Sequence, residues 1–293
     1  MSKPYYQDDY VTLWHGDSLE ILPTLAGGES VQSVITDPPY NIGKASWDFI
    51  ENYEAWCAEW VIGASRALTP DGGFWCFHSE PLVLARIVEQ IQGEGRKLVS
   101  WVTLDKSSWG IAKRYANAGT KTFPASVEYA AYSRAEVYAD QIRALRETLG
   151  LTRGEFDMEV SPSRKPTGIT YRWEKGERIP QAREVELIRE KWGVELSIPA
   201  FSNPAKHSVV WQFPQPDTTD HPTAKPLSIM ERMVESTTNV GDTILDPFAG
   251  SGATLVAAKN LGRKAVGVEL DEKYCEVIAK RCAQDLLELE WTA

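Results

Sequence analysis

The sequence predicts an α/β fold built on one mostly parallel sheet. Residues 30–37 (SVQSVITD) and 72–79 (GGFWCFHS) have the length and apolar character of buried strands that end in polar turns. Near the end of the chain, residues 241–246 and 264–271 have the same strand character. A helical pattern separates the two strands of each pair, and strand, helix, strand is the order typical of parallel sheets covered by helices.

The helices follow from the spacing of apolar residues. Residues 52–68 place apolar side chains at helical spacing between the first two strands. Residues 247–262 begin as a Gly-rich turn and continue as a helix that Gly262 closes. Residues 272–291 form a final helix with one apolar face.

The middle of the chain, about residues 105–215, does not follow this alternation of strands and helices. A strand at residues 126–133 is followed by helical stretches and a loop rich in Pro, Ser and Lys. We therefore expect residues 1–135 and 200–293 to form one domain together, with residues 136–199 as a mainly helical insertion.

Composition narrows the class of protein. The chain has 293 residues, of which 43% are hydrophobic and 25% charged, and no apolar run approaches the ~18 residues of a membrane helix. It shows no apolar signal segment and no C-x-x-C pair among its four cysteines. We expect a cytoplasmic protein with reduced thiols and no membrane contact. The net charge of −10 argues by itself against nucleic acid, but basic residues gather in the middle, where a local surface can meet phosphates.

A glycine-rich turn near the C-terminus indicates a ligand site. The segment LDPFAGSGATL places Asp246, Gly250 and Gly252 where a strand passes into a helix, and glycine lets the backbone approach a ligand there. Glu269 ends the next strand, at about the spacing at which doubly wound folds hold a ribose diol. The turn is neither G-x-G-x-x-G nor G-K-[ST], and its leading carboxylate suits an ammonium group, as in S-adenosylmethionine. The alternative is that the glycines merely close the turn.

DPPY at residues 37–40 and DPFAGSG at residues 246–252 together resemble the amino-methyltransferases of DNA, in the motif order of their β class. The resemblance extends over about residues 10–135 and 205–285. It is carried further by the segments LWHGDSLEIL, DPPYNIGKASWD, SWVTLDKSSWG, FPASVEYAAYSR and HPTAKPLSIMERMV. It implies a Rossmann-like sheet of seven mostly parallel strands with permuted motif order, S-adenosyl-L-methionine as cofactor and double-stranded DNA as substrate.

The resemblance also implies a chemistry for DPPY. Asp37 and the carbonyl of Pro38 would each accept one N–H of an exocyclic amine, and Pro38 and Pro39 would hold that carbonyl in place. The ring of Tyr40 would stack on a base flipped out of the duplex. Asp at position 37 favours adenine N6 as the methylated atom, and cytosine N4 is the alternative with the same mechanism.

A cofactor-binding set follows from the same resemblance. Its members lie near the ends of the expected strands and in the HPTAKP segment. They are Asp17, Asp37, Thr223, Lys225, Asp246, Phe248, Gly250, Ser251, Gly252 and Glu269.

The insertion resembles a helix-turn-helix of the Cro/C1-repressor type. LGLT at residues 149–152 would open the second helix, and the WEKGERIP stretch at residues 173–180, with Trp173, Glu174, Gly176 and Pro180, would follow the recognition helix. The gap between these two is about three residues longer than is usual, and Pro162 and Pro166 crowd the turn. If the resemblance holds, PTGITYRW starts the recognition helix; the alternative is a helical packing module that touches no DNA.

Two groups of basic and polar residues are candidate DNA contacts. The loop after residue 105 interleaves basic and aromatic residues, which suits phosphates and a distorted duplex; it is otherwise a solvated loop. The candidates there are Lys106, Lys113, Arg114 and Lys121, and those in the insertion are Arg164, Lys165, Thr167 and Arg172.

Other classes of function are less well supported. The chain has four histidines without metal-binding spacing, so we expect no metal. Methylation of a protein glutamine or an RNA base is disfavoured by the motif order, and a non-catalytic DNA-binding regulator by the intact DPPY and glycine turn. Several relatives of the β class dimerise, so a homodimer is one expected assembly. The resemblance fits a restriction–modification enzyme with a partner endonuclease, a phage genome-protection enzyme and a regulatory methylase equally well.

Overall fold

The computed structural model describes residues 3–25, 31–43, 48–106, 127–161, 165–202, 208–212 and 224–284. The chain divides into two compact units, Met1–Ser133 with Ala200–Ala293, and Arg134–Pro199. Each unit has a hydrophobic core of its own. Within the ranges just given, no helix is both long and apolar enough to cross a membrane.

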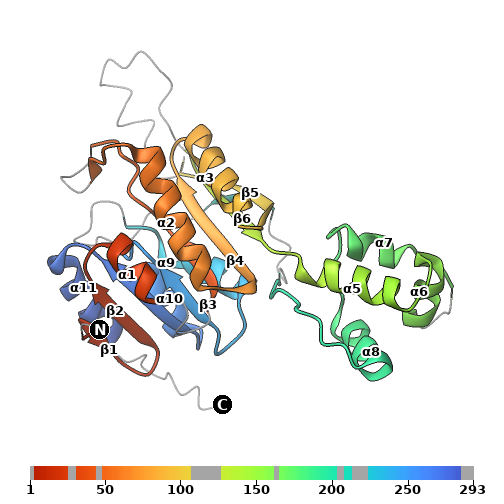
Figure 1. Ribbon diagram of the computed structural model, residues 1–293. Coiled ribbons are helices and arrows are strands. Elements are labelled where there is room, and N and C mark those ends of the chain that lie inside the picture. Colours follow the sequence, from red (N-terminus) through yellow and green to blue (C-terminus); the bar gives the residue numbers. More distant parts are fainter. Residues whose placement is uncertain are drawn as a thin grey trace. The chain divides into compact units, whose positions relative to one another are not determined.

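One sheet organises the first unit (Figure 1). Its nine described strands lie in the order β1-β2-β9-β8-β3-β4-β6-β5-β7. They are β1 (Tyr6–Gln7), β2 (Val11–His15), β3 (Val31–Thr36), β4 (Leu68–His78), β5 (Lys97–Asp105), β6 (Val127–Arg134), β7 (Val210–Gln212), β8 (Thr243–Asp246) and β9 (Lys264–Glu269).

The expected count of seven strands was wrong, and the sheet is mixed. Strands β2, β9, β8, β3 and β4 run parallel in consecutive pairs, but β1 pairs antiparallel with β2. The additional strands are short: β1 has two residues and β7 has three. Segments of this length carry no hydrophobic period of their own, so the sequence pattern does not reveal them.

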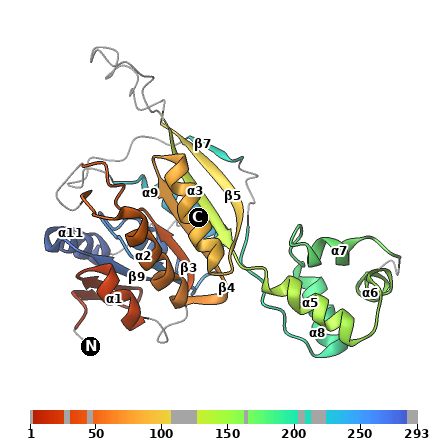
Figure 2. The same ribbon diagram turned by 45° about the horizontal axis from the view of Figure 1, so that its top comes forward.

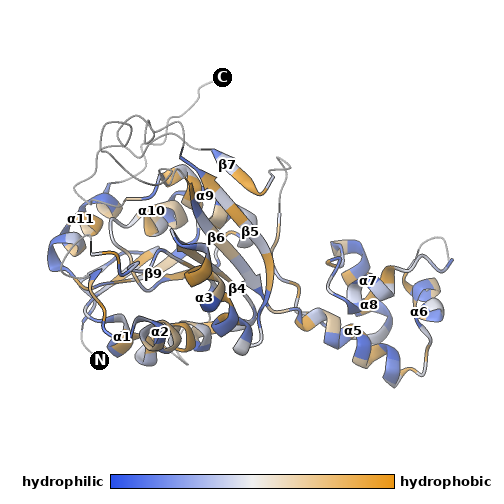
Figure 3. Cartoon of the chain, turned by 90° about the horizontal axis from the view of Figure 1, so that it is seen from above, coloured by the Kyte–Doolittle hydropathy of each residue, from blue (hydrophilic) through white to orange (hydrophobic). Residues whose placement is uncertain are grey.

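Helices cover both faces of the sheet because its buried strands alternate their side chains between two cores. Ile35 and Ile244 face the core that contains residues of α9 (Leu227–Thr237), α10 (Ala253–Asn260) and α11 (Glu272–Ala283). Val34 and Leu245 face the core that contains residues of α1 (Ser18–Leu25), α2 (Tyr53–Ala67) and α3 (Pro81–Gly93). Figures 2 and 3 show the sheet between these two sets of helices. The four cysteines are free and buried.

The second unit consists of four described helices around their own core. They are α5 (Val137–Thr148), α6 (Arg153–Val160), α7 (Ile169–Glu174) and α8 (Ala182–Trp192). Trp173 and Phe156 are fully buried at its centre, with Tyr138 and Ile188 beside them. Burial of side chains this large is the main source of stability for so small a unit.

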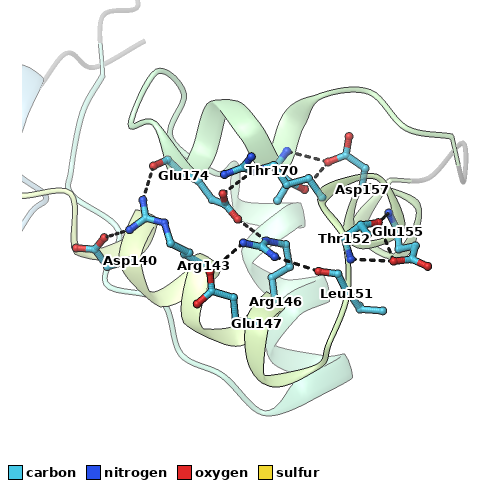
Figure 4. A network of polar contacts seen from close by, with 11 residues as sticks. Asp140, Arg143, Arg146, Glu147, Leu151, Thr152, Glu155, Asp157, Thr170 and Glu174 are labelled. Carbon is cyan, nitrogen blue, oxygen red and sulfur yellow. Dashed lines mark hydrogen bonds and ion pairs between the residues drawn. The ribbon is translucent and has the colours of Figure 1, made fainter.

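Polar caps fix the starts of α6 and α7 (Figure 4). Thr152 begins α6 with a capping box that includes Glu155. Further along α6, Asp157 accepts the backbone N–H groups of Thr167 at 2.8 Å, Gly168 at 2.5 Å and Thr170 at 2.8 Å. Burial raises the pKa of Asp157, but these hydrogen bonds more than offset it and hold the pKa below its usual value. One carboxylate therefore caps the first turn of α7 and ties it to α6.

A buried ion pair joins α5, α6 and α7. Glu174 is 4% exposed, and its Oε1 and Oε2 accept from Arg146 Nε at 2.5 Å and Arg153 Nε at 2.7 Å. Its backbone carbonyl accepts from Arg143 at 2.8 Å (Figure 4). One glutamate therefore connects three helices, and its buried carboxylate neutralises the largely buried Arg146.

We expect Glu174→Ala to lower the free energy of unfolding of the second unit by about 3 kcal/mol, because it removes the buried carboxylate that pairs with the largely buried Arg146 and leaves only the exposed Glu147 beside it. Native-state hydrogen exchange should show faster exchange of amides in residues 137–192, with little change in β3, β8 and β9. Glu177→Ala, at an exposed position three residues along, is the matched control and should change stability by less than about 0.5 kcal/mol. Equal protection in the two variants would contradict the role of Glu174.

Candidate functional site

The parallel strands bring polar side chains from both ends of the chain to one edge of the sheet. The register pairs His15 with Glu269 between β2 and β9, and Asp246 with Gly267 between β8 and β9. Because parallel strands end at the same edge, residues 16–17, 37–40 and 246–251 lie together there. The edge is where open α/β sheets bind ligands.

A single cavity of about 370 Å³ opens at this edge. Its wall combines the segment after β3 with the turn after β8, which are more than 200 residues apart in sequence. Of the residues expected from sequence, the wall contains Asp17, Asp37, Pro38, Pro39, Tyr40, Lys225, Asp246, Phe248, Gly250, Ser251 and Glu269. Thr223 lies outside the described residues.

The DPPY segment is held rigidly in the wall of the cavity. The Tyr40 hydroxyl donates to Asp37 Oδ1 at 2.6 Å, and Lys225 Nζ donates to Asp37 Oδ2 at 2.5 Å. The Tyr53 hydroxyl donates to the carbonyl of Pro39 at 2.6 Å. Hydrogen bonds therefore fix both the carboxylate and the backbone that follows it.

His78, at the end of β4, packs its ring against Tyr40 of this segment. Its ring lies 4.4 Å from the Tyr40 ring between centroids, and its Nδ1 accepts from Glu80 N–H at 2.9 Å. Burial lowers the pKa of His78 to about 4. The ring is therefore neutral near pH 7 and carries its proton on Nε2, which lies 3.3 Å from the Tyr53 hydroxyl.

Two buried carboxyl groups border the glycine turn. Asp246 accepts from the Thr36 hydroxyl at 2.8 Å and Phe248 N–H at 3.1 Å, and burial raises its pKa to about 6. Glu269 accepts from Gly250 N–H at 2.7 Å, and burial raises its pKa to about 7. Gly250 has φ of +54°, the left-handed region that favours glycine. Raised carboxyl pKa values in a cavity are typical of ligand sites.

Gly252, which we expected to bind the ligand, is outside the wall of the cavity. A Cβ at this position would lie 2.9 Å from the side chain of Ile278, and its φ is +79°. Glycine is needed there for the turn and for close packing of α10 on α11. Asp17, which does line the cavity, also accepts from Leu19 N–H at 2.8 Å at the start of α1.

The candidate DNA contacts divide between the described and undescribed parts of the chain. Lys113, Arg114, Lys121 and Arg164 lie outside the described residues. Lys165, Thr167 and Arg172 are exposed on the second unit. Lys106 differs from the expectation: its side chain is 16% exposed and its Nζ lies 2.9 Å from Glu128 Oε1, so a phosphate would have to compete with that carboxylate.

Sequence reasoning missed several residues of the cavity wall. Glu128, Trp56 and Met230 line it although the resemblance gave none of them a role. Glu128 had a signal, since it is the acidic residue of the otherwise apolar strand SVEYAAYS. Trp56 and Met230 are on helices whose apolar period explains them equally well as core residues.

Comparison with known proteins places this geometry among enzymes. A family model described as DNA methylase matches residues 31–281. The Type II methyltransferase M.ScaI of Streptomyces caespitosus is 28% identical over 96% of this chain and 84% of its own length. The DNA adenine methyltransferase YhdJ of Escherichia coli is 26% identical over 92% of this chain and 82% of its own length.

Solved structures show the same fold. The M1.HpyAVI–SAM complex superposes with a TM-score of 0.60 at 20% identity, covering 94% of this chain and 100% of that one. The cytosine-N4-specific PvuII DNA methyltransferase superposes with a TM-score of 0.62 at 16% identity, covering 97% of this chain and 90% of that one.

We expect the raised pKa of Glu269 to make stability depend on pH. Between its ordinary value of 4.5 and about 7, the folded protein keeps a proton that the unfolded chain has lost. This contribution to stability therefore falls as pH rises through that range. The stability of Glu269→Gln relative to the unaltered protein should increase from pH 5 to pH 7.5, as measured by urea unfolding.

The quantity to compare is the difference in unfolding free energy between Glu269→Gln and the unaltered protein, because His78 changes the pH dependence of stability in the opposite direction. Its pKa of about 4 makes the folded state bind fewer protons than the unfolded chain below pH 6.5. His78 is present in both proteins and cancels. A pH-independent difference would show that Glu269 is ionised in the folded protein throughout.

Proposed function

Residues 31–281 match the N6/N4 DNA methylase family, so the chain belongs to it, and we propose that it methylates the exocyclic N6 amine of adenine at a specific site in double-stranded DNA. One observation carries the proposal: Asp37 and the Gly250 turn open into the same cavity. A methyl donor held by the turn can therefore meet an amine held by Asp37. A separate cavity for each would not permit the reaction.

The residues of the cavity fit its cofactor, S-adenosyl-L-methionine. The volume of about 370 Å³ lies within the range of small-ligand sites. Glu269 offers carboxylate oxygens to a ribose diol, and Phe248 offers an apolar ring whose position is fixed by Trp56 and Trp60 at 5.2 and 5.3 Å between centroids. Asp246 is an acid that a ligand ammonium would stabilise in its charged form. When bound, the cofactor supplies a methyl group activated by a sulfonium.

The chain's own residues make the amine reactive. An exocyclic amine is a poor nucleophile because its lone pair is delocalised into the base. Asp37 accepts one N–H and the carbonyl of Pro38 accepts the other, which favours a tetrahedral nitrogen without a strong base. Pro38 is buried and the next carbonyl is held by Tyr53, so these acceptors are positioned before the base arrives. Tyr40 presents its ring to a base that has left the duplex.

Aspartate at position 37 supports adenine N6, because cytosine-N4 enzymes of this motif order more often carry serine there. YhdJ, an adenine methyltransferase, is similar to this chain over most of its length. The second candidate is cytosine N4 with the same mechanism, and the structural likeness to the PvuII enzyme supports it. Either base presents a conjugated amine to the same pair of acceptors.

The second unit is proposed to bind the DNA that surrounds the target base. In the order of the helix-turn-helix resemblance, α6 is the second helix and α7 the recognition helix. Lys165, Thr167 and Arg172 are exposed in and before α7, whose start is fixed by Asp157. The extra residues of the turn lie just before the capped segment, so the cap supports a defined orientation for α7 despite the longer connection.

We expect Asp37→Ala to abolish methyl transfer while cofactor binding persists, because the mutant loses an acceptor for the amine and keeps Glu269 and the glycine turn. Unmethylated genomic DNA would be incubated with each protein, digested to nucleosides and separated. The unaltered protein should yield N6-methyl-2′-deoxyadenosine, and Asp9→Ala, at an exposed carboxylate outside the cavity wall, should match it. N4-methyl-2′-deoxycytidine would establish the second candidate, and full activity of Asp37→Ala would refute the mechanism.

Lys165→Ala combined with Arg172→Ala should weaken DNA binding and lower its dependence on salt by up to about two counterions, because each residue is proposed to meet a phosphate or base. The dissociation constant would be measured over a series of salt concentrations. Arg189→Ala combined with Lys191→Ala is the matched control, since these basic residues of α8 pair with Glu186 and Glu159. An equal salt dependence in both variants would favour a packing module.

A further inference from the structure

The carboxylate of Asp37 is already neutralised before any base arrives. Its Oδ2 lies 2.5 Å from Lys225 Nζ, and its Oδ1 accepts from the Tyr40 hydroxyl at 2.6 Å. Lys225 Nζ also lies 3.3 Å from the Tyr40 hydroxyl. An ammonium in this position competes with the target amine for the acceptor that is meant to polarise it.

Lys225 cannot relieve this competition by turning into solvent. Its side chain is 8% exposed, and it packs near the rings of Tyr40 and Phe77. Burial acts to lower the pKa of Lys225, but Asp37 and Glu128 outweigh it and raise the pKa above its usual value. The side chain is therefore a buried ammonium that needs a carboxylate in every state of the site.

Glu128 is the second carboxylate within reach. It projects from β6 into the cavity wall, 11% exposed, with Oε2 3.6 Å from Lys225 Nζ. Its other carboxylate oxygen, Oε1, lies 2.9 Å from Lys106 Nζ, so this ion pair holds the Glu128 side chain in place. The distance of 3.6 Å is an ion pair but not yet a hydrogen bond, so a small rotation of the lysine would complete it.

We propose that Glu128 is a positioning residue that takes the Lys225 ammonium from Asp37 when the target amine binds. The inference rests on the proposed methylation at the same cavity. No bond to hydrogen or carbon forms or breaks in this step: an ammonium moves from one carboxylate to another. Asp37 then faces the amine with its negative charge uncompensated.

Moving the ammonium from Asp37 to Glu128 would lower the energy of the transition state for methyl transfer. Positive charge develops on the amine nitrogen as the methyl group is transferred, so a carboxylate stabilises the transition state and an adjacent ammonium opposes it. Glu128 draws the ammonium away without leaving it unpaired. Lys106 in turn holds Glu128 in place, so the four groups Asp37, Lys225, Glu128 and Lys106 stay balanced in sign.

Glu128→Gln tests the proposal because it keeps the shape of the side chain and removes its charge. Methyl incorporation would be measured with radiolabelled S-adenosyl-L-methionine at saturating concentration and unmethylated amplified genomic DNA. We expect kcat to fall roughly tenfold or more, because Lys225 stays on Asp37, while the KM for the cofactor is unchanged.

A second substitution separates charge exchange from damage to the fold. In the double variant Glu128→Gln with Lys225→Met no ammonium competes for Asp37, so it should be faster than Glu128→Gln alone. Glu128→Asp, which keeps the charge, should be faster than Glu128→Gln, and it carries the test if the glutamine variant does not fold. Asp8→Asn is the matched control: it removes the carboxylate 2.8 Å from Lys259, outside the cavity wall, and should leave kcat unchanged.

The outcomes distinguish this inference from the function on which it rests. If the unaltered protein transfers no methyl group to DNA, the proposed function fails. If the unaltered protein is active and Glu128→Gln is equally fast, only the role of Glu128 fails. A double variant slower than Glu128→Gln would also overturn the exchange, since it would show that Lys225 aids Asp37 during transfer.

Discussion

The parallel alignment of β3, β8 and β9 is the constraint on which the rest of this molecule depends. Side chains that follow three strands can share a cavity only if those strands end at the same edge. The register between β8 and β9 and between β3 and β8 satisfies that condition for Asp37, Asp246 and Glu269. The two helical layers keep the register, because a shift of one residue would exchange the faces of Ile244 and Leu245.

Within the cavity, polar groups are held by the protein itself before any ligand binds. Backbone N–H groups of residues 248, 250 and 271 satisfy Asp246 and Glu269, and the carbonyl of Pro39, two residues after Asp37, is held by Tyr53. Acids kept in such surroundings have raised pKa values and gain most from a ligand that donates hydrogen bonds or carries positive charge. Binding and chemistry thus use the same feature, the low exposure of charged groups to water.

Much of this arrangement could be predicted from sequence, and the failures have physical causes. Buried strands such as VQSVIT and TILD can be predicted from their apolar composition. DPPY and the glycine turn can be predicted from their resemblance to a known family, so most residues of the cavity wall that we expected are found there. The cofactor predicted from them is confirmed. The two edge strands were missed because two or three residues carry no period. Gly252 was expected in the cavity because spacing does not say which way a turn faces. Glu128 and its pairing with Lys106 were missed because ion pairs between distant segments depend on tertiary structure.

The place of β3 in the sheet has a consequence for how the protein is made. Strands β3 and β4 are close in sequence, so they leave the ribosome one soon after the other. The other neighbour of β3 in the sheet, β8, begins only at Thr243. Until then the nascent chain carries β3 with one edge open, and an open edge invites pairing with other chains. The contacts of the four-helix unit are local in sequence, so it can form before β8 is synthesised. Completion of the cavity therefore waits for β8 and β9, and a chain terminated before Thr243 would lack part of the cavity wall and keep an open sheet edge that favours aggregation.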